Sequence, residues 1–102
     1  MTISDTKIKT VLSGLGFTVF PIVADEGASV PFVTYRRTGS ETSKDNVTSI
    51  FYDVTLVAGS YAKSVEMLGT LLGSEFFEDY EDKGEEYAEG YYMQNIGVTI
   101  EN

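Results

Sequence analysis

The sequence contains neither cysteine nor histidine among its 102 residues. The missing cysteine excludes disulfides, thiolate metal sites and cysteine nucleophiles, and it fits a reducing compartment. The missing histidine removes the commonest general base and the commonest metal ligand near neutral pH, so histidine-based triads and zinc sites are excluded. We therefore expect a protein without enzymatic activity, catalytic residues, bound metal or cofactor.

Long apolar runs are also missing. No stretch approaches the roughly 20 residues that a membrane-spanning helix needs. The first seven residues lack the charged-then-apolar pattern of a signal peptide. We expect a soluble protein made in the cytoplasm, with no membrane contact. A length of 102 residues with 42% hydrophobic residues is typical of one folded domain, residues 1–102.

Basic side chains are few, seven lysines and arginines against sixteen acids, which gives a net charge of -9. Nucleic-acid backbones repel such a chain, so we expect no direct nucleic-acid binding. The charge is unevenly distributed. The segment from Glu75 to Glu89, here called the acidic segment, holds eight acidic side chains and only Lys83 as a basic one, a local charge of -7.

The spacing of apolar residues predicts two helices, each with one buried stripe. The first begins at Ser4 or Asp5, and the second begins at Ser60 and ends at Gly73. The stripe of the first consists of Ile8, Val11, Leu12 and Leu15, and that of the second of Tyr61, Val65, Leu68 and Leu72, widened by Met67 and Leu71.

Four stretches rich in β-branched and aromatic residues are predicted strands: residues 17–23, 32–37, 47–58 and 91–100. Pro21 places the first at a sheet edge. Residues 38–46 are polar and predict a long, mobile loop. We expect the last strand to pair with residues 47–58. These elements indicate an α+β fold: a mainly antiparallel four-stranded sheet with two helices on one face, in the order α-β-β-β-α-β.

The alternation in residues 47–58 distinguishes the two faces of the predicted sheet. The core face carries Ile50, Tyr52, Val54, Leu56 and Ala58, and the other face carries Phe51, Asp53, Thr55 and Val57. If helices cover only one face, then Phe51, Val57, Tyr35 and Val33 are exposed and mark a subunit interface. Alternatively, the acidic segment folds over them.

The acidic segment has three interpretations. Clustered carboxylates can bind calcium, but Lys83 and Gly90 stand where an EF-hand loop needs ligands, so we expect no calcium site. A carboxylate pair for glycoside hydrolysis needs two acids facing a cleft, which a run of exposed acids rarely provides. We favour a solvated loop or short helix that can serve as an acidic contact surface. Its buried anchors would be Phe76, Phe77, Tyr80 and Tyr87.

Arg36 and Arg37 are the only arginines, and as neighbours on a strand they point to opposite faces. They therefore cannot form one clamp. At least one should lie on the less buried face, where it is solvated, pairs with a carboxylate of its own chain, or reaches a neighbouring subunit.

Several short strings, together with the order of the elements, resemble the small tail-completion or tail-terminator proteins of long-tailed bacteriophages and prophages. The resemblance spans essentially the whole chain. After an opening helix, the matching strings are FTVFP at 17–21, VPFVTYR at 30–36, YDVTLVA at 52–58, SYAKSV at 60–65, DYED at 79–82 and IGVTI at 96–100.

The resemblance implies a structural protein of the virion, in the tail or neck. Such proteins lack enzymatic activity and form rings, typically hexamers, at the head-proximal end of the tail tube, where they end tube growth and join the tail to the head. The implied partners are copies of the chain, monomeric before assembly, and the tail-tube and head-connector proteins. Candidate interface residues are Arg36, Arg37, Glu41, Lys44, Asp45, Phe51, Val57, Asp79, Glu81 and Asp82. The alternative is an acidic inhibitor or DNA mimic that offers the acidic segment to a basic partner site.

Overall fold

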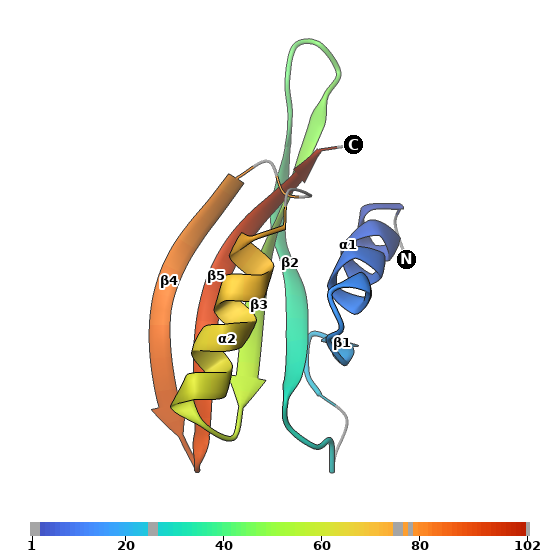
Figure 1. The fold of residues 1–102 in the computed structure, drawn as a ribbon. Helices are drawn as coiled ribbons and strands as arrows, with labels where there is room; N and C mark the ends of the chain where they lie inside the picture. The colour runs from blue at the N-terminus through green and yellow to red at the C-terminus, as the bar shows by residue number, and fades with distance from the viewer. Residues whose placement is uncertain (1–2, 25–26, 75–76, 78, 102) are drawn as a thin grey trace.

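The computed structural model describes residues 3–24, 27–74, 77 and 79–101 (Figure 1). Within these residues the chain forms two helices and five strands. Their bounds are α1 Ile3–Gly14, β1 Val19–Pro21, β2 Phe32–Thr42, β3 Thr48–Ala58, α2 Tyr61–Leu72, β4 Asp79–Ala88 and β5 Tyr91–Glu101.

The strands form one mixed sheet in the order β1-β2-β3-β5-β4. β1 runs parallel to β2, and the other neighbours are antiparallel. The α+β class, the edge position of the strand with Pro21 and the pairing of the last strand with β3 are confirmed. The predicted four-stranded sheet is wrong in detail, because the acidic segment contributes a fifth strand.

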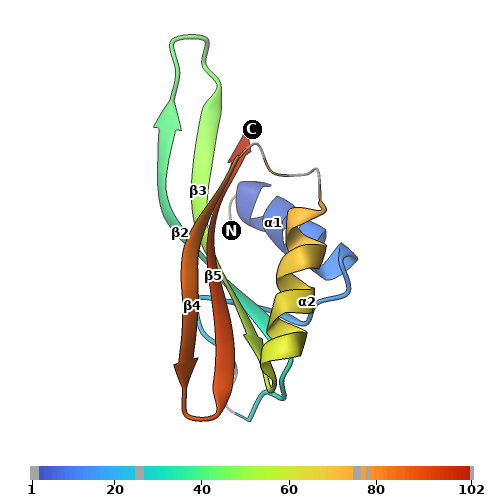
Figure 2. The same cartoon turned by 60° about the vertical axis from the view of Figure 1, so that its left-hand side comes forward.

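Both helices pack on the same face of the sheet, as predicted (Figure 2). Ile8 and Leu12 of α1 and Met67 and Leu71 of α2 are buried against it. The opposing sheet residues are Val33, Tyr35, Ile50, Tyr52, Val54, Leu56, Ala58, Ile96, Val98 and Ile100. This layer confirms the stripe of the first helix and the core face of residues 47–58. α1 begins at Ile3, so Ser4 and Asp5 lie in its first turn rather than before it. A shift of this size is usual at helix ends.

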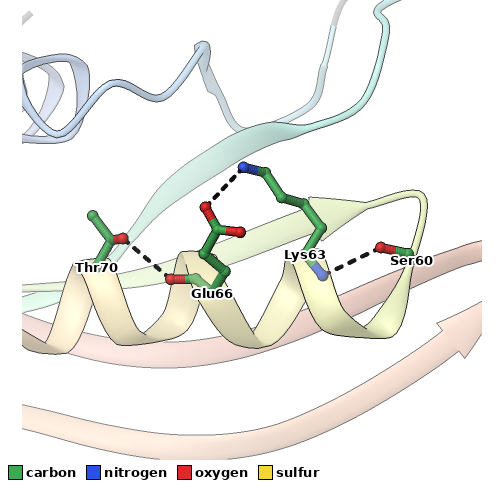
Figure 3. Close-up of polar contacts among 4 residues, drawn as sticks. All are labelled: Ser60, Lys63, Glu66 and Thr70. Atoms are coloured by element: carbon green, nitrogen blue, oxygen red, sulfur yellow. Dashed lines mark hydrogen bonds and ion pairs between the residues drawn. The ribbon is translucent and has the colours of Figure 1, made fainter.

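α2 begins where the sequence predicts. Ser60 is extended, and its hydroxyl accepts a hydrogen bond from the backbone N–H of Lys63 at 3.2 Å (Figure 3). This bond satisfies one of the free donors in the first turn. Along the same side of the helix, Lys63 pairs with Glu66 at 3.2 Å, and the hydroxyl of Thr70 donates to the Glu66 carbonyl at 3.1 Å.

The buried stripe of α2 matches the predicted one only in part. Met67 and Leu71 are buried with Ser64, and Leu68 packs partly against the core, as predicted apart from Ser64. Tyr61, Val65 and Leu72 are 52%, 43% and 47% exposed, so their prediction as buried residues is wrong. Both sets have helical spacing, so periodicity alone could not choose between them. The packing of α2 on β5 decides, because the small Ser64 lets the helix approach the buried Gln94, whose amide donates to the Ser64 hydroxyl at 3.3 Å.

The predicted loop at residues 38–46 is wrong, because β2 continues to Thr42 and pairs with β3 as far as Thr42 opposite Thr48. The turn is closed by hydrogen bonds from Ser43 N to Val47 O at 2.8 Å and from Asn46 N to Ser43 O at 3.0 Å. Among the described residues β5 ends at Glu101, opposite Ser49. Residues 41–49, here called the hairpin arm, therefore project from the body of the sheet (Figures 1 and 2). Neither face of this two-stranded ribbon packs against the core, so its strands need no alternation of apolar and polar residues. The sequence pattern that predicts a strand is therefore missing from residues 38–46.

The acidic segment was predicted as a loop or short helix, and this was also wrong. Residues 79–88 form the edge strand β4 and pair with β5 from Asp79 opposite Thr99 to Ala88 opposite Tyr91. The two strands are joined at Glu89 and Gly90, both with positive φ (54° and 86°), as in the tightest hairpin turns. Backbone pairing with β5 overrides the weak strand propensity of the acids.

The predicted anchors of the acidic segment have mixed outcomes. Phe77 is buried, and Tyr80 packs partly against the core, with its hydroxyl donating to the carbonyl of Ser74. Tyr87 is 63% exposed, so its prediction as a buried anchor is wrong. It lies one residue from the end of β4, next to the turn at Glu89 and Gly90. Phe76 lies outside the described residues.

Candidate functional site

The sheet face without helices, here called the open face, carries several of the predicted interface residues. Cross-strand register assigns Phe32, Thr34 and Arg36 of β2 to it, with Phe51, Asp53, Thr55 and Val57 of β3, Met93, Asn95, Gly97 and Thr99 of β5, and Asp79, Glu81 and Glu86 of β4. Neighbours in register share a face. The open face is thus a mixed surface of half-buried apolar groups and exposed charges.

Val33 and Tyr35 do not belong to this face. They stand opposite Leu56 and Val54 on the helix side, where both are buried. No local pattern determines the register between β2 and β3, and a shift of one residue exchanges the two faces of a strand. Val57 does lie on the open face, yet it is only 7% exposed. It stands on a central strand between Phe32 and Met93, so the prediction that it is exposed is wrong.

Arg36 and Arg37 point to opposite faces, as predicted. Arg36 stands opposite Asp53 on the open face, and Arg37 stands opposite Tyr52 on the helix face. Both are exposed. In the part of the chain that the structure describes, the two ion pairs are Lys63–Glu66 and Lys83–Asp53, and neither includes an arginine. Both guanidinium groups are thus available for a contact outside the chain.

A lysine bridges three strands on the open face. Lys83 of β4 reaches over Gly97 of β5 and places its Nζ 2.6 Å from a carboxylate oxygen of Asp53 on β3. A Cβ at Gly97 would lie 3.1 Å from Cε of Lys83, so a side chain there would displace the lysine. The hydrogen bond with Asp53 raises the pKa of Lys83. The bridge braces the acidic edge strand against the centre of the sheet.

Beside this bridge the open face is hollowed, with a volume of about 320 Å³. Phe51, Asp79 and Glu81, all predicted interface residues, line the hollow with Asp53 and Lys83. The structure therefore brings these three candidates together, with Arg36 nearby in the row of Asp53 and Gly97. Asp82 is not among them, because it stands opposite Ile96 and belongs to the helix face.

The remaining candidates, Glu41, Lys44 and Asp45, lie on the hairpin arm. All three are exposed. The arm is held by its backbone pairing and by contacts such as the one between the hydroxyls of Thr42 and Thr48 at 3.2 Å. It thus presents its charges on an ordered ribbon.

A second surface was missed at the level of sequence. Between α2 and β4, Tyr61, Glu85, Tyr87, Tyr92 and Gln94 surround a hollow of about 280 Å³. The sequence does not indicate that Tyr61, Glu85, Tyr87 and Tyr92 share one surface. They come from α2, β4 and β5, and neither the strand β4 nor its pairing with β5 was predicted. A usable signal was the second apolar stripe on α2, since only one stripe could face the sheet.

The arrangement suits binding through surfaces. Among the described residues no group of three or more carboxylates lies close enough to hold a metal ion. Alternation along β4, shifted by one residue at the bulge between Asp82 and Gly84, explains this, since Glu81 and Glu86 lie on one face and Asp82 and Glu85 on the other. None of the helices in the described ranges is long and apolar enough to cross a membrane.

Comparison with known proteins adds no family: no protein-family model matches the chain, and no curated protein matches it significantly.

Proposed function

We propose that the chain is a structural subunit of a phage or prophage virion, forming a ring at the head-proximal end of the tail. The ring, a hexamer of monomers made in the host cytoplasm, ends growth of the tail tube and joins the tail to the head. It has no enzymatic activity and no cofactor. Its partners are copies of the chain, the tail-tube protein and a head-connector protein.

The observation that carries the proposal is the pair of dissimilar sheet borders. At one border, β1 covers β2 only from Val33 to Tyr35, so among the described residues no strand pairs with Arg36 and Arg37 on the side away from β3. At the other border stands β4 with Asp79, Glu81, Asp82, Glu85 and Glu86, all exposed. A ring needs two different, complementary surfaces on each subunit, and opposite charge favours their correct pairing.

The hairpin arm supports a joint between two structures. It extends past the end of β5, and the described part of the molecule is 45 Å long but only 24 and 22 Å across. A projecting ribbon with exposed charges can contact a neighbouring protein above or below the plane of a ring. The resemblance of the sequence strings to tail-terminator proteins supplies the identity of those neighbours.

The proposal is tested by light scattering after size exclusion and by negative-stain electron microscopy, with and without isolated tail tubes. We expect the wild type to form closed rings on tube ends, and Arg36→Glu or Arg37→Glu to give a folded monomer without rings. Lys63→Glu is the control, since it reverses the same charge on a helix and not on either border strand.

The arm is tested by replacing residues 43–47 with an Asn-Gly turn. A longer cut through residue 38 would remove the strand that pairs with Ile50 and Phe51, and would therefore confuse folding with assembly. The short cut should leave the fold intact and prevent tail completion. Normal completion by the arginine and arm variants would contradict these roles, whereas salt-sensitive one-to-one binding to a nuclease or repressor would support the acidic-inhibitor alternative.

A further inference from the structure

The groove between α2 and β4 has one apolar wall and one acidic wall. Two adjoining hollows, of about 280 and 350 Å³, share Tyr61, Glu85 and Gln94. On the helix side the wall continues with Val65 and Leu68, and on the strand side with Asp82 and Gly84. We call this feature the α2–β4 groove.

Three tyrosines form a cluster at one end of the groove. The ring of Tyr92 lies 6.1 Å from that of Tyr61 and 4.7 Å from that of Tyr87, measured between centroids. The rings are inclined by 67° and 45°, so they do not stack flat on one another. Tyr61 and Tyr87 are 52% and 63% exposed. Aromatic surface is therefore available beside the carboxylate of Glu85.

Glu85 is held in place by a buried polar chain. Gln94, only 2% exposed, donates from Nε2 to Oε2 of Glu85 at 2.8 Å and to the Ser64 hydroxyl at 3.3 Å. The Ser64 hydroxyl in turn donates to the backbone carbonyl of Tyr61 at 2.7 Å. A hydrogen bond with Glu85 raises the pKa of Tyr61. One acid and one tyrosine are thus positioned relative to each other by the core.

No basic side chain neutralises this end of the groove among the described residues that line it. Asp82, Glu85 and Glu86 line the two hollows. The nearest lysine along β4, Lys83, turns to the open face and pairs with Asp53. Uncompensated carboxylates next to aromatic faces are complementary to an organic cation, because both the negative charge and the ring quadrupole attract it.

We propose that the α2–β4 groove binds an arginine or lysine side chain of a partner polypeptide, with its cation between Glu85 and the rings of Tyr61, Tyr87 and Tyr92. Apolar residues flanking that side chain would pack along Val65 and Leu68. The site does not depend on ring formation, and the partner is a segment of another protein in which apolar residues flank the arginine or lysine.

The test is an NMR titration of the isotope-labelled full chain with three peptides: Ac-Val-Arg-Val-NH2, Ac-Val-Lys-Val-NH2 and the neutral analogue with citrulline in place of arginine. We expect shift changes at Tyr61, Glu85 and Tyr87 with the two cationic peptides and none with the citrulline peptide. Free guanidinium ion tests whether the cation alone suffices, and weaker binding than by the arginine peptide would show that the flanking apolar wall contributes.

Two substitutions on the same strand separate the site from general attraction to an acidic surface. Glu85→Gln should weaken arginine-peptide binding about two- to fivefold, the range for an exposed ion pair. Glu81→Gln removes the same charge from the open face of β4 and should leave the affinity unchanged. Equal losses in the two variants, equal binding of the citrulline peptide, or shift changes confined to the open face would overturn the proposal.

Because Glu85 contacts the buried Gln94, its variant is first checked for the dispersed amide spectrum of the wild type. Should Glu85→Gln unfold, Tyr87→Leu replaces it, since Tyr87 is largely exposed and its loss removes an aromatic surface without disturbing the core. Unchanged binding by Tyr87→Leu would then contradict the aromatic part of the site. Ring formation by the same variants is measured separately, so loss of peptide binding with intact rings distinguishes this proposal from the proposed function.

Discussion

Adjacent leucines on α2 provide a direct test of which side of this helix packs on the sheet. Leu71 is 0% exposed and belongs to the core, whereas Leu72 is 47% exposed. The same substitution, leucine to alanine, therefore removes the same atoms from two opposite environments one residue apart. The comparison is matched for helix propensity and for position in the last turn of the helix.

The expected costs follow from burial. Leu71→Ala removes fully buried carbon atoms and leaves a cavity among rigid neighbours, which costs about 2–5 kcal/mol of unfolding free energy. Leu72→Ala removes a half-exposed side chain and leaves no enclosed cavity, so its cost should stay below about 1 kcal/mol. Since about 1 kcal/mol corresponds to roughly 4–8 °C for a domain of this size, the Tm of Leu71→Ala should lie at least roughly 4 °C below that of Leu72→Ala.

The assay is urea unfolding followed by far-UV circular dichroism, with the slope of the transition compared between variants to confirm an unchanged unfolding reaction. Equal costs, or a larger cost for Leu72→Ala, would refute the reasoning. They would mean that the stripe of Tyr61, Val65, Leu68 and Leu72 faces the sheet after all. The apolar wall of the α2–β4 groove would then be absent.

Substitutions at three further positions test local features of the fold. Ser60→Ala should lower the unfolding free energy by about 1 kcal/mol through loss of the helix cap, measured by the same urea titration. Asn46 has a φ of 63°, so Asn46→Gly should be nearly neutral while Asn46→Val should cost about 1–2 kcal/mol in the arm, a difference that equal stabilities would disprove. Because Asp53 raises the pKa of Lys83 above 10.5 in the folded chain, their pair stabilises fully below that pH and is lost as the pH rises through the folded pKa. Lys83→Met should therefore be destabilised by up to about 1 kcal/mol at pH 7, and the gap from wild type should narrow in alkaline titration above pH 10.5; a gap independent of pH would show that the bridge contributes nothing.

Local physical chemistry in the sequence determined a large part of this protein. The stripe of Ile8 and Leu12, the cap at Ser60 and the alternation from Ile50 to Ala58 each depend on residues close together in the chain. The helices, the central strand and the α+β class could be predicted for that reason. The absence of cysteine and histidine likewise limited the chemistry before any fold was considered.

Strand pairing and packing determined the features for which local sequence patterns allowed more than one structure. The residues of β4 have weak strand propensity, and they are extended because β5 supplies hydrogen-bond partners. The contact between Ser64 and Gln94 of β5 determines which side of α2 faces the sheet. The register between β2 and β3 determines that Val33 and Tyr35 lie on the helix-covered face. The meeting of Tyr61, Glu85 and Tyr92 in one groove depends on all of these choices. Residues distant in sequence come together through pairing and packing, which a local pattern does not encode.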